Sequence, residues 1–115
     1  MNKTVKNKWI EALRSGEYEQ GICSLRKDNK YCCLGVLCDL YGKENDTPWV
    51  KYVSEEEFRF LGHNKWLPKE VRDWAGVDYN RVSLPKCIGD RTDLVQLNDS
   101  GCSFDYIADV IEEQF

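Results

Sequence analysis

An apolar run in the first half of the chain limits the choice of folds more than any other segment. Residues 34–41 (LGVLCDLY) contain one charged side chain, Asp39, and are followed by Gly42. A run this apolar can face water along one edge at most, so we expect it in the core. Its length and the terminal glycine favour a short buried helix, and a buried strand is the alternative.

Helical periodicity marks both ends of the chain. Apolar residues recur at helical spacing over residues 5–13, with Thr4 as the expected N-cap and Gly16 as the stop. Residues 92–99 and 104–113 predict two further helices, and the second of them carries a continuous apolar stripe.

The segments between these helices give two further predictions. Residues 23–27 and 30–33 flank Asp28-Asn29, a polar pair that tolerates the positive φ angles of a two-residue turn. This pattern predicts a β-hairpin. Residues 67–76 have a proline near the first turn, apolar residues at helical spacing and a terminal glycine, which together predict a short helix.

Taken together, these elements predict an α+β fold in one small domain over residues 1–115. We expect the N- and C-terminal helices to pack on a short antiparallel hairpin or small sheet. A length of 115 residues, of which 42% are hydrophobic, suffices for one core and leaves no room for two. Residues 77–91 are expected to be irregular or extended, and the pattern of residues 49–66 fits a strand and a helix equally.

The six cysteines follow neither a disulfide pattern nor a zinc pattern. None belongs to a C-x-x-C pair, and His63 is the only histidine, so the usual ligand spacing of structural zinc is missing. The N-terminus lacks an apolar signal core, and no apolar run approaches the roughly 20 residues of a membrane span. We therefore expect a cytoplasmic protein without a bound metal, with reduced thiols that mostly pack as small hydrophobic side chains.

The charge balance opposes binding to nucleic acid polymers. Lys and Arg number 16 against 20 Asp and Glu, which gives a net charge of −4. This charge disfavours nonspecific attraction to polyphosphates and anionic membranes. Residues 97–111 resemble the opening of a helix-turn-helix motif, but the helix after the turn carries four acidic residues and no basic one. We therefore expect neither a nucleic acid polymer nor a membrane as a partner.

The sequence also lacks the common catalytic motifs. It has no glycine-rich phosphate loop, no H-E-x-x-H and no paired-carboxylate metal signature. His63 lies in a turn-like context, and the cysteines have apolar neighbours, which raise the pKa of a thiol. We expect no catalytic residue and no cofactor, with a thiol-dependent or hydrolytic enzyme as the minor alternative.

Interleaved basic and aromatic residues predict instead a site for a small anionic ligand that contains a ring. Aromatic side chains stack on a planar base, and arginine holds a phosphate through two directed hydrogen bonds. Trp9 and Trp74 lie on apolar helix faces and are assigned to the core. Asn98 and Asp99 could hydrogen-bond to sugar hydroxyls, although closing a helix or turn is the commoner role of such residues. The expected ligand-binding residues are Arg26, Tyr31, Trp49, Arg59, Trp66, Asn98 and Asp99.

The chain resembles a family of small proteins encoded by tailed bacteriophages. Two segments mark the resemblance: YCCLGVLCDL at residues 31–40, and LNDSG at 97–101 followed by SF and IAD. Residues 8–18 and 67–76 extend it over nearly the whole chain. The resemblance implies a phage origin and a small accessory role. Accessory proteins of this kind include some that sequester the nucleotide signals of bacterial immunity, such as cyclic dinucleotides and ADP-ribose derivatives.

Two functions fit these observations. The first is a non-catalytic anti-defence protein that binds and holds a nucleotide-derived immune signal, with a homo-oligomer interface that encloses more of the ligand than one chain can. The second is a protein–protein inhibitor that docks on a host defence factor through an acidic surface. Glu55-Glu56-Glu57 and Glu112-Glu113 are local acidic runs that suit the second function.

Overall fold

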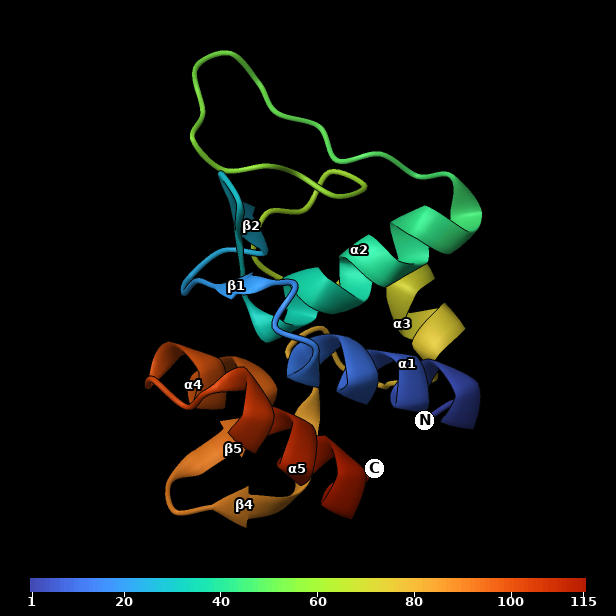
Figure 1. Cartoon of the computed structure of the whole chain (residues 1–115), viewed down its shortest axis with the longest axis vertical. Coiled ribbons are helices and arrows are strands. Elements are labelled where there is room, and N and C mark those ends of the chain that lie inside the picture. Colours follow the sequence, from blue (N-terminus) through green and yellow to red (C-terminus); the bar gives the residue numbers. More distant parts are fainter.

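A computed structural model describes all 115 residues and shows five helices and five short strands (Figure 1). The predicted α+β fold is confirmed. The elements, in chain order, are α1 (Lys3–Arg14), β1 (Glu19–Gln20), β2 (Arg26–Lys27), β3 (Lys30–Tyr31), α2 (Cys33–Asn45), α3 (Lys69–Ala75), β4 (Ser83–Ile88), β5 (Arg91–Asp93), α4 (Leu94–Asp99) and α5 (Phe104–Gln114).

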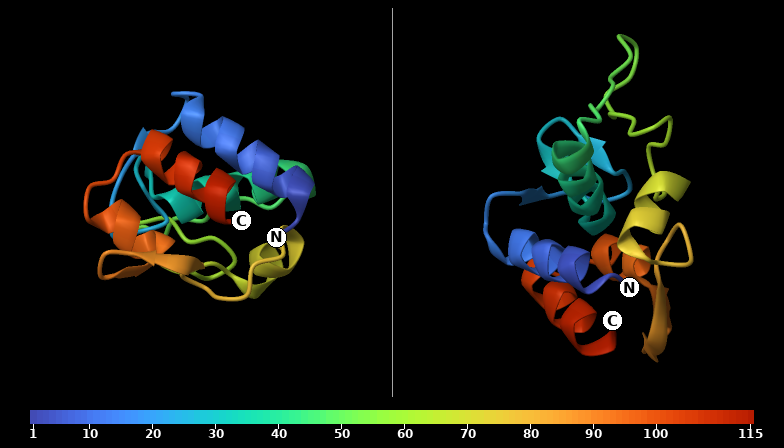
Figure 2. Two further views of the ribbon diagram at one scale, coloured as in Figure 1. Left: turned by 90° about the horizontal axis from the view of Figure 1, so that it is seen from below. Right: turned by 90° about the vertical axis from the view of Figure 1, so that its right-hand side faces the viewer.

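Helix α2 forms the centre of the fold: α1, α3 and α4 pack against it, and α5 packs on α1 and α4 (Figures 1 and 2). Its residues 33–38 are all buried, so the apolar run is a buried helix and the strand alternative is wrong. Gly42 does not end this helix, which continues to Asn45 and stops at Asp46 in the left-handed conformation (φ 51°). Gly42 instead permits close packing, because a Cβ there would lie 2.5 Å from the carbonyl oxygen of Thr47.

Helices α1 and α5 lie side by side, with the two chain termini at the same end of the pair (Figure 2). Trp9 on α1 is fully buried, as predicted, and its indole N–H donates to the Cys33 carbonyl (3.0 Å). The predicted N-cap Thr4 is wrong. Asn2 lies in extended backbone and accepts from the Val5 N–H (3.0 Å), which places Thr4 inside the first turn.

The other helix predictions agree with the structure. Helix α3 ends at Gly76 with φ 71°, and Trp74 on it is half-buried and packs edge-on against Tyr41 (5.4 Å between centroids). Ser103 caps α5 by accepting from the Tyr106 N–H (3.2 Å). Helix α4 begins two residues later than residue 92, because the Asp93 carboxylate caps it.

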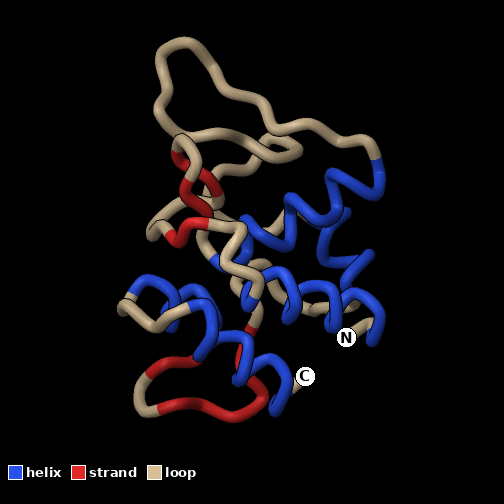
Figure 3. The backbone as a smooth tube through the Cα atoms, in the orientation of Figure 1, coloured by secondary structure: helices blue, strands red, loops and turns tan.

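The strands form two small sheets (Figure 3). Strands β2 and β3 form the predicted antiparallel hairpin, with Asp28 in the left-handed conformation (φ 53°) at its turn, but its arms are shorter than residues 23–27 and 30–33 because Cys33 begins α2. Strand β1 adds to β3 in parallel, which local sequence patterns do not predict. Strands β4 and β5 form a second hairpin in the segment expected to be irregular or extended.

Residues 49–66 form neither a helix nor a regular strand. They make a long loop that projects from the helices (Figures 1 and 3), held by isolated backbone pairs such as Val50 with Arg59. No helix is long and apolar enough to cross a bilayer.

All six cysteines are free, and Cys32, Cys33 and Cys38 belong to the core. Burial raises the pKa of the Cys32 thiol to about 12 and raises the pKa of the other two thiols well above the ordinary value. These three side chains therefore pack as neutral hydrophobic groups, whereas Cys23 and Cys87 are exposed.

Candidate functional site

The β2–β3 hairpin places an arginine directly over a tyrosine. Its register sets Arg26 opposite Tyr31, so the two side chains extend from the same face of the hairpin. The guanidinium carbon of Arg26 lies 5.2 Å from the centroid of the Tyr31 ring. Both side chains are half-buried, which leaves part of each in contact with solvent.

The projecting loop adds two more rings to this pair. The Phe58 N–H donates to the Arg26 carbonyl (2.9 Å), and this bond fastens the loop to β2. The guanidinium carbon of Arg26 lies 3.9 Å from the Phe58 centroid and 5.7 Å from the centroid of Trp49. Three aromatic rings therefore surround one guanidinium, and we name Arg26, Tyr31, Trp49 and Phe58 the Arg26 cluster.

Arg26 differs from the arginines that form ion pairs. Its Nε donates to the Asp28 carbonyl (2.9 Å), and no carboxylate lies within 4.0 Å of it. Arg14, Arg59 and Arg81, by contrast, each contact at least one carboxylate at 2.7–3.0 Å. The rings hold the guanidinium in place by cation–π contact, while its two terminal nitrogens make no hydrogen bond to the protein.

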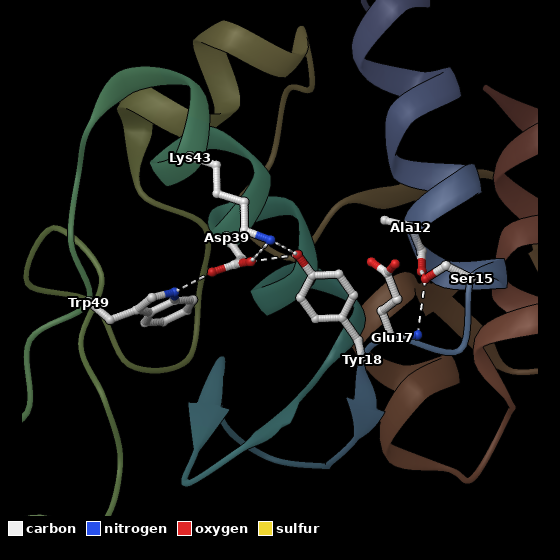
Figure 4. Close-up of polar contacts among 7 residues, drawn as sticks. All are labelled: Ala12, Ser15, Glu17, Tyr18, Asp39, Lys43 and Trp49. Atoms are coloured by element: carbon white, nitrogen blue, oxygen red, sulfur yellow. Dashed lines mark hydrogen bonds and ion pairs between the residues drawn. The ribbon is translucent and has the colours of Figure 1, made fainter.

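The aromatic side of the cluster is held by Asp39, the one charged residue of the apolar run (Figure 4). Its carboxylate accepts from the Trp49 indole N–H (3.0 Å) and from the Tyr18 hydroxyl (2.5 Å). Lys43, one turn further along α2, lies 3.3 Å from the same carboxylate and donates to the Tyr18 hydroxyl (3.3 Å). Tyr18 in turn packs edge-on against the Tyr31 ring, with 5.1 Å between the centroids. Asp39 therefore supports Trp49 directly and Tyr31 through Tyr18.

The turn that leads from α1 to Tyr18 is fixed by Ser15. The Ser15 hydroxyl donates to the Ala12 carbonyl (2.7 Å) and accepts from the Glu17 N–H (3.1 Å) (Figure 4). The local bonds of this turn aim the following residue, Tyr18, across the molecule towards α2.

The phenol of Tyr18 is held in its protonated form. Desolvation and then the hydrogen bond to Asp39 raise the pKa of Tyr18 from 10 to about 12. A folded-state pKa above the unfolded one gives a stabilisation that is complete below pH 10 and is lost as the pH rises towards 12.

We therefore predict that Tyr18→Phe flattens the alkaline decline in stability. Between about pH 10 and pH 12, the free energy of unfolding of the parent should fall more steeply than that of the variant, measured by urea denaturation. Tyr79→Phe, at an exposed tyrosine outside the cluster, is the control and should follow the parent. Equal slopes for the parent and Tyr18→Phe would contradict the prediction.

The remaining predicted binding residues lie outside the Arg26 cluster. Arg59 is paired with Glu55 inside the projecting loop, through two hydrogen bonds of 3.1 and 3.0 Å. Trp66 and Asp99 line a separate small hollow of about 180 Å³. Arg81 covers the Trp66 ring at 4.7 Å, and Asp99 accepts from the Cys23 N–H (3.1 Å).

Asn98 is fully buried and joins three parts of the chain. Its side-chain oxygen accepts from the Cys33 N–H (3.1 Å) and from the Gln20 amide (3.0 Å), and its nitrogen donates to the Gly21 carbonyl (2.9 Å). Both polar side-chain atoms of Asn98 therefore already have hydrogen-bond partners within the protein. The structure assigns it to packing between α4, α2 and the segment after β1.

Sequence patterns located Arg26, Tyr31 and Trp49, and the structure brings these three together. They did not single out Tyr18, Asp39 or Lys43 as parts of the site. A lone acid inside an apolar helix was the available signal for Asp39, because a half-buried carboxylate requires donors around it. No three side chains among His, Cys, Asp and Glu gather where they could hold a metal ion.

No curated protein and no solved structure matches the chain. One family model does match, over residues 1–115, and its description is domain of unknown function DUF8296. Because this match spans the full length, the chain belongs to the DUF8296 family.

Proposed function

We propose that this protein binds a small nucleotide-like anion at the Arg26 cluster and holds it without converting it. One observation carries the proposal: a guanidinium positioned by three rings that has no carboxylate partner. Arginine in a fixed orientation offers parallel N–H donors that match phosphate oxygens. Phe58 covers one face of the Arg26 guanidinium, so ligand oxygens would reach it at the edge formed by the terminal nitrogens.

The groups around the cluster suit binding better than proton transfer. Tyr18 keeps its proton at neutral pH, and the Asp39 carboxylate is already shared by three donors. We therefore assign both groups to positioning the Tyr31 and Trp49 rings. The resemblance to phage accessory proteins adds the role we propose: an anti-defence protein in the host cytosol that removes a cyclic dinucleotide or ADP-ribose derivative from its receptor.

The proposal is tested by ligand binding to Arg26→Ala. We expect the parent to be stabilised in a thermal-shift panel of cyclic dinucleotides, ADP-ribose and mononucleotides, and the nucleotide to be recovered unchanged by mass spectrometry. Arg26→Ala should bind about tenfold more weakly or worse, because a charge-assisted hydrogen bond contributes roughly 1.5–3 kcal/mol. Arg26→Lys keeps the charge without the paired donors and should recover only part of the affinity.

The control is Arg91→Ala, which removes an arginine that also lacks an ion pair but lies on β5, outside the cluster. It should bind as the parent does. Parent-like affinity of Arg26→Ala would refute the site, and conversion of the nucleotide to a product would refute sequestration in favour of an enzyme.

A protein partner is the second candidate function, and the projecting loop favours it. The loop exposes the large apolar side chains of Val50, Tyr52, Val53 and Leu61, and Val53 is fully exposed. A protruding apolar tip of this kind suits insertion into a cleft of another protein. This candidate predicts no stabilisation by any nucleotide, and loss of inhibition of the host factor when Tyr52 and Val53 are both replaced by alanine.

A further inference from the structure

We propose that the ligand of the Arg26 cluster carries two phosphate groups, and that Lys51 binds the second. This inference rests on the proposed function and narrows its ligand class. The ammonium of Lys51 lies 5.9 Å from the centroid of Phe58, the same ring that supports Arg26 at 3.9 Å. Two cations thus share one ring.

The pairing of the loop with itself sets this arrangement. Val50 and Arg59 exchange two backbone hydrogen bonds (2.9 and 2.6 Å) as an antiparallel pair. In that register, Lys51 stands opposite Phe58, and Trp49 stands opposite Phe60. The second pair is seen directly as an edge-to-face contact of 4.9 Å between centroids. Because side chains alternate along an extended chain, Trp49 and Lys51 lie on one face of the loop. Arg26 contacts one ring of each pair, Trp49 and Phe58.

The charges of these two residues are not neutralised by the protein. Neither Arg26 nor Lys51 has a carboxylate within 4.0 Å, although Lys27 and Lys43 beside them are paired with Glu56 and Asp39. The two distances to the Phe58 centroid limit the separation of the cations to 9.8 Å. This separation is close to the Debye length of about 8 Å in physiological salt, so the two cations repel each other only weakly and both stay available to anions.

A ligand with two phosphate groups can place one anion beside each cation, whereas a ligand with one phosphate concentrates its charge at a single point. The separation limit is compatible with phosphates that are adjacent, as in a pyrophosphate, or separated by a sugar, as in a cyclic dinucleotide. Lys51 is exposed, so the second phosphate meets no steric obstacle at its ammonium. The geometry therefore points to nucleotides with two phosphate groups.

The test compares nucleotides with one and two phosphate groups by isothermal titration calorimetry. The probes are AMP, ADP-ribose and a cyclic dinucleotide, each titrated into the parent, Lys51→Gln and Lys65→Gln. Lys65 is an exposed lysine without an ion pair outside the cluster, so its variant controls for the loss of one charge. We expect the parent to bind at least one two-phosphate probe about tenfold more tightly than AMP. Lys51→Gln should lose most of that preference, because its affinity for the two-phosphate probe falls much further than its affinity for AMP, and Lys65→Gln should keep the preference.

Three results would overturn the inference. If Lys51→Gln keeps the full preference, or the parent binds AMP as tightly as both two-phosphate probes, Lys51 is not a second phosphate site. In either case loss of binding in Arg26→Ala would still support the proposed function. If the parent binds none of the probes, the proposed function fails together with this inference.

Discussion

Replacing Gly35 by alanine is expected to destabilise the protein by about 3 kcal/mol or more. In the interior of most helices the same change is stabilising by about 1 kcal/mol, because glycine is the more flexible residue. Here a Cβ on Gly35 would lie 1.8 Å from the carbonyl oxygen of Leu25 and 2.7 Å from its carbonyl carbon. Both atoms belong to the backbone at the base of the β2–β3 hairpin, where the Leu25 carbonyl also accepts from Cys32. The hairpin and α2 must move apart to admit the methyl group.

This prediction is checked by urea denaturation of Gly35→Ala beside the parent. Gly89→Ala is the matched control, since Gly89 has open space around its Cα and a φ of 62°. The control should cost about 1–2 kcal/mol, the strain of a left-handed L-residue. A Gly35→Ala protein as stable as the parent would show that α2 does not rest directly on the hairpin backbone.

The Gly35 contact joins two elements that are distinct in sequence, and contacts of this kind limit what local sequence patterns can predict. The helices were predictable because their signals are local: the apolar run of α2, the apolar stripe of α5, and the glycine that follows α3. Other details were missed because packing or a neighbouring cap overrode the local pattern. Gly42 has the local signature of a helix end, but it lies inside α2. There the Thr47 carbonyl and the Phe60 ring approach it so closely that a side chain would not fit without a shift.

The candidate site was predictable only in part, for a related reason. Arg26 and Tyr31 face each other across a two-residue turn, and such a turn sets the register of a hairpin from local sequence. Trp49 and Phe58 lie on a loop in which Val50 pairs with Arg59 across an irregular connection. No short turn motif in the sequence indicates this register. Strand β1 joins β3 in parallel, so it too depends on tertiary contacts.

Asn98→Ala is expected to lower the free energy of unfolding by about 2–4 kcal/mol, because the truncation leaves buried polar groups without partners. The groups concerned are the Cys33 N–H at the start of α2 and the Gly21 carbonyl. No side chain at the N-cap of α2 satisfies that N–H, since Cys32 makes no capping bond. Asn98 thus caps α2 from a distance, and the LNDSG segment is tied to the YCCLGVLCDL segment by a hydrogen bond.

The measurement compares Asn98→Ala with Asp99→Ala by urea denaturation and by calorimetry with a nucleotide that the parent binds. Asp99 is exposed, and its carboxylate accepts from the Cys23 N–H (3.1 Å) and, at a longer distance, from the Asn98 amide (3.4 Å), so its variant should lose about 1 kcal/mol. Asn98→Ala should lose stability but keep its affinity for the nucleotide at temperatures where it is folded. An Asn98→Ala protein with parent stability and weakened nucleotide binding would reverse the assignment: Asn98 would contact the ligand, and the site would lie beside Trp66 and Asp99.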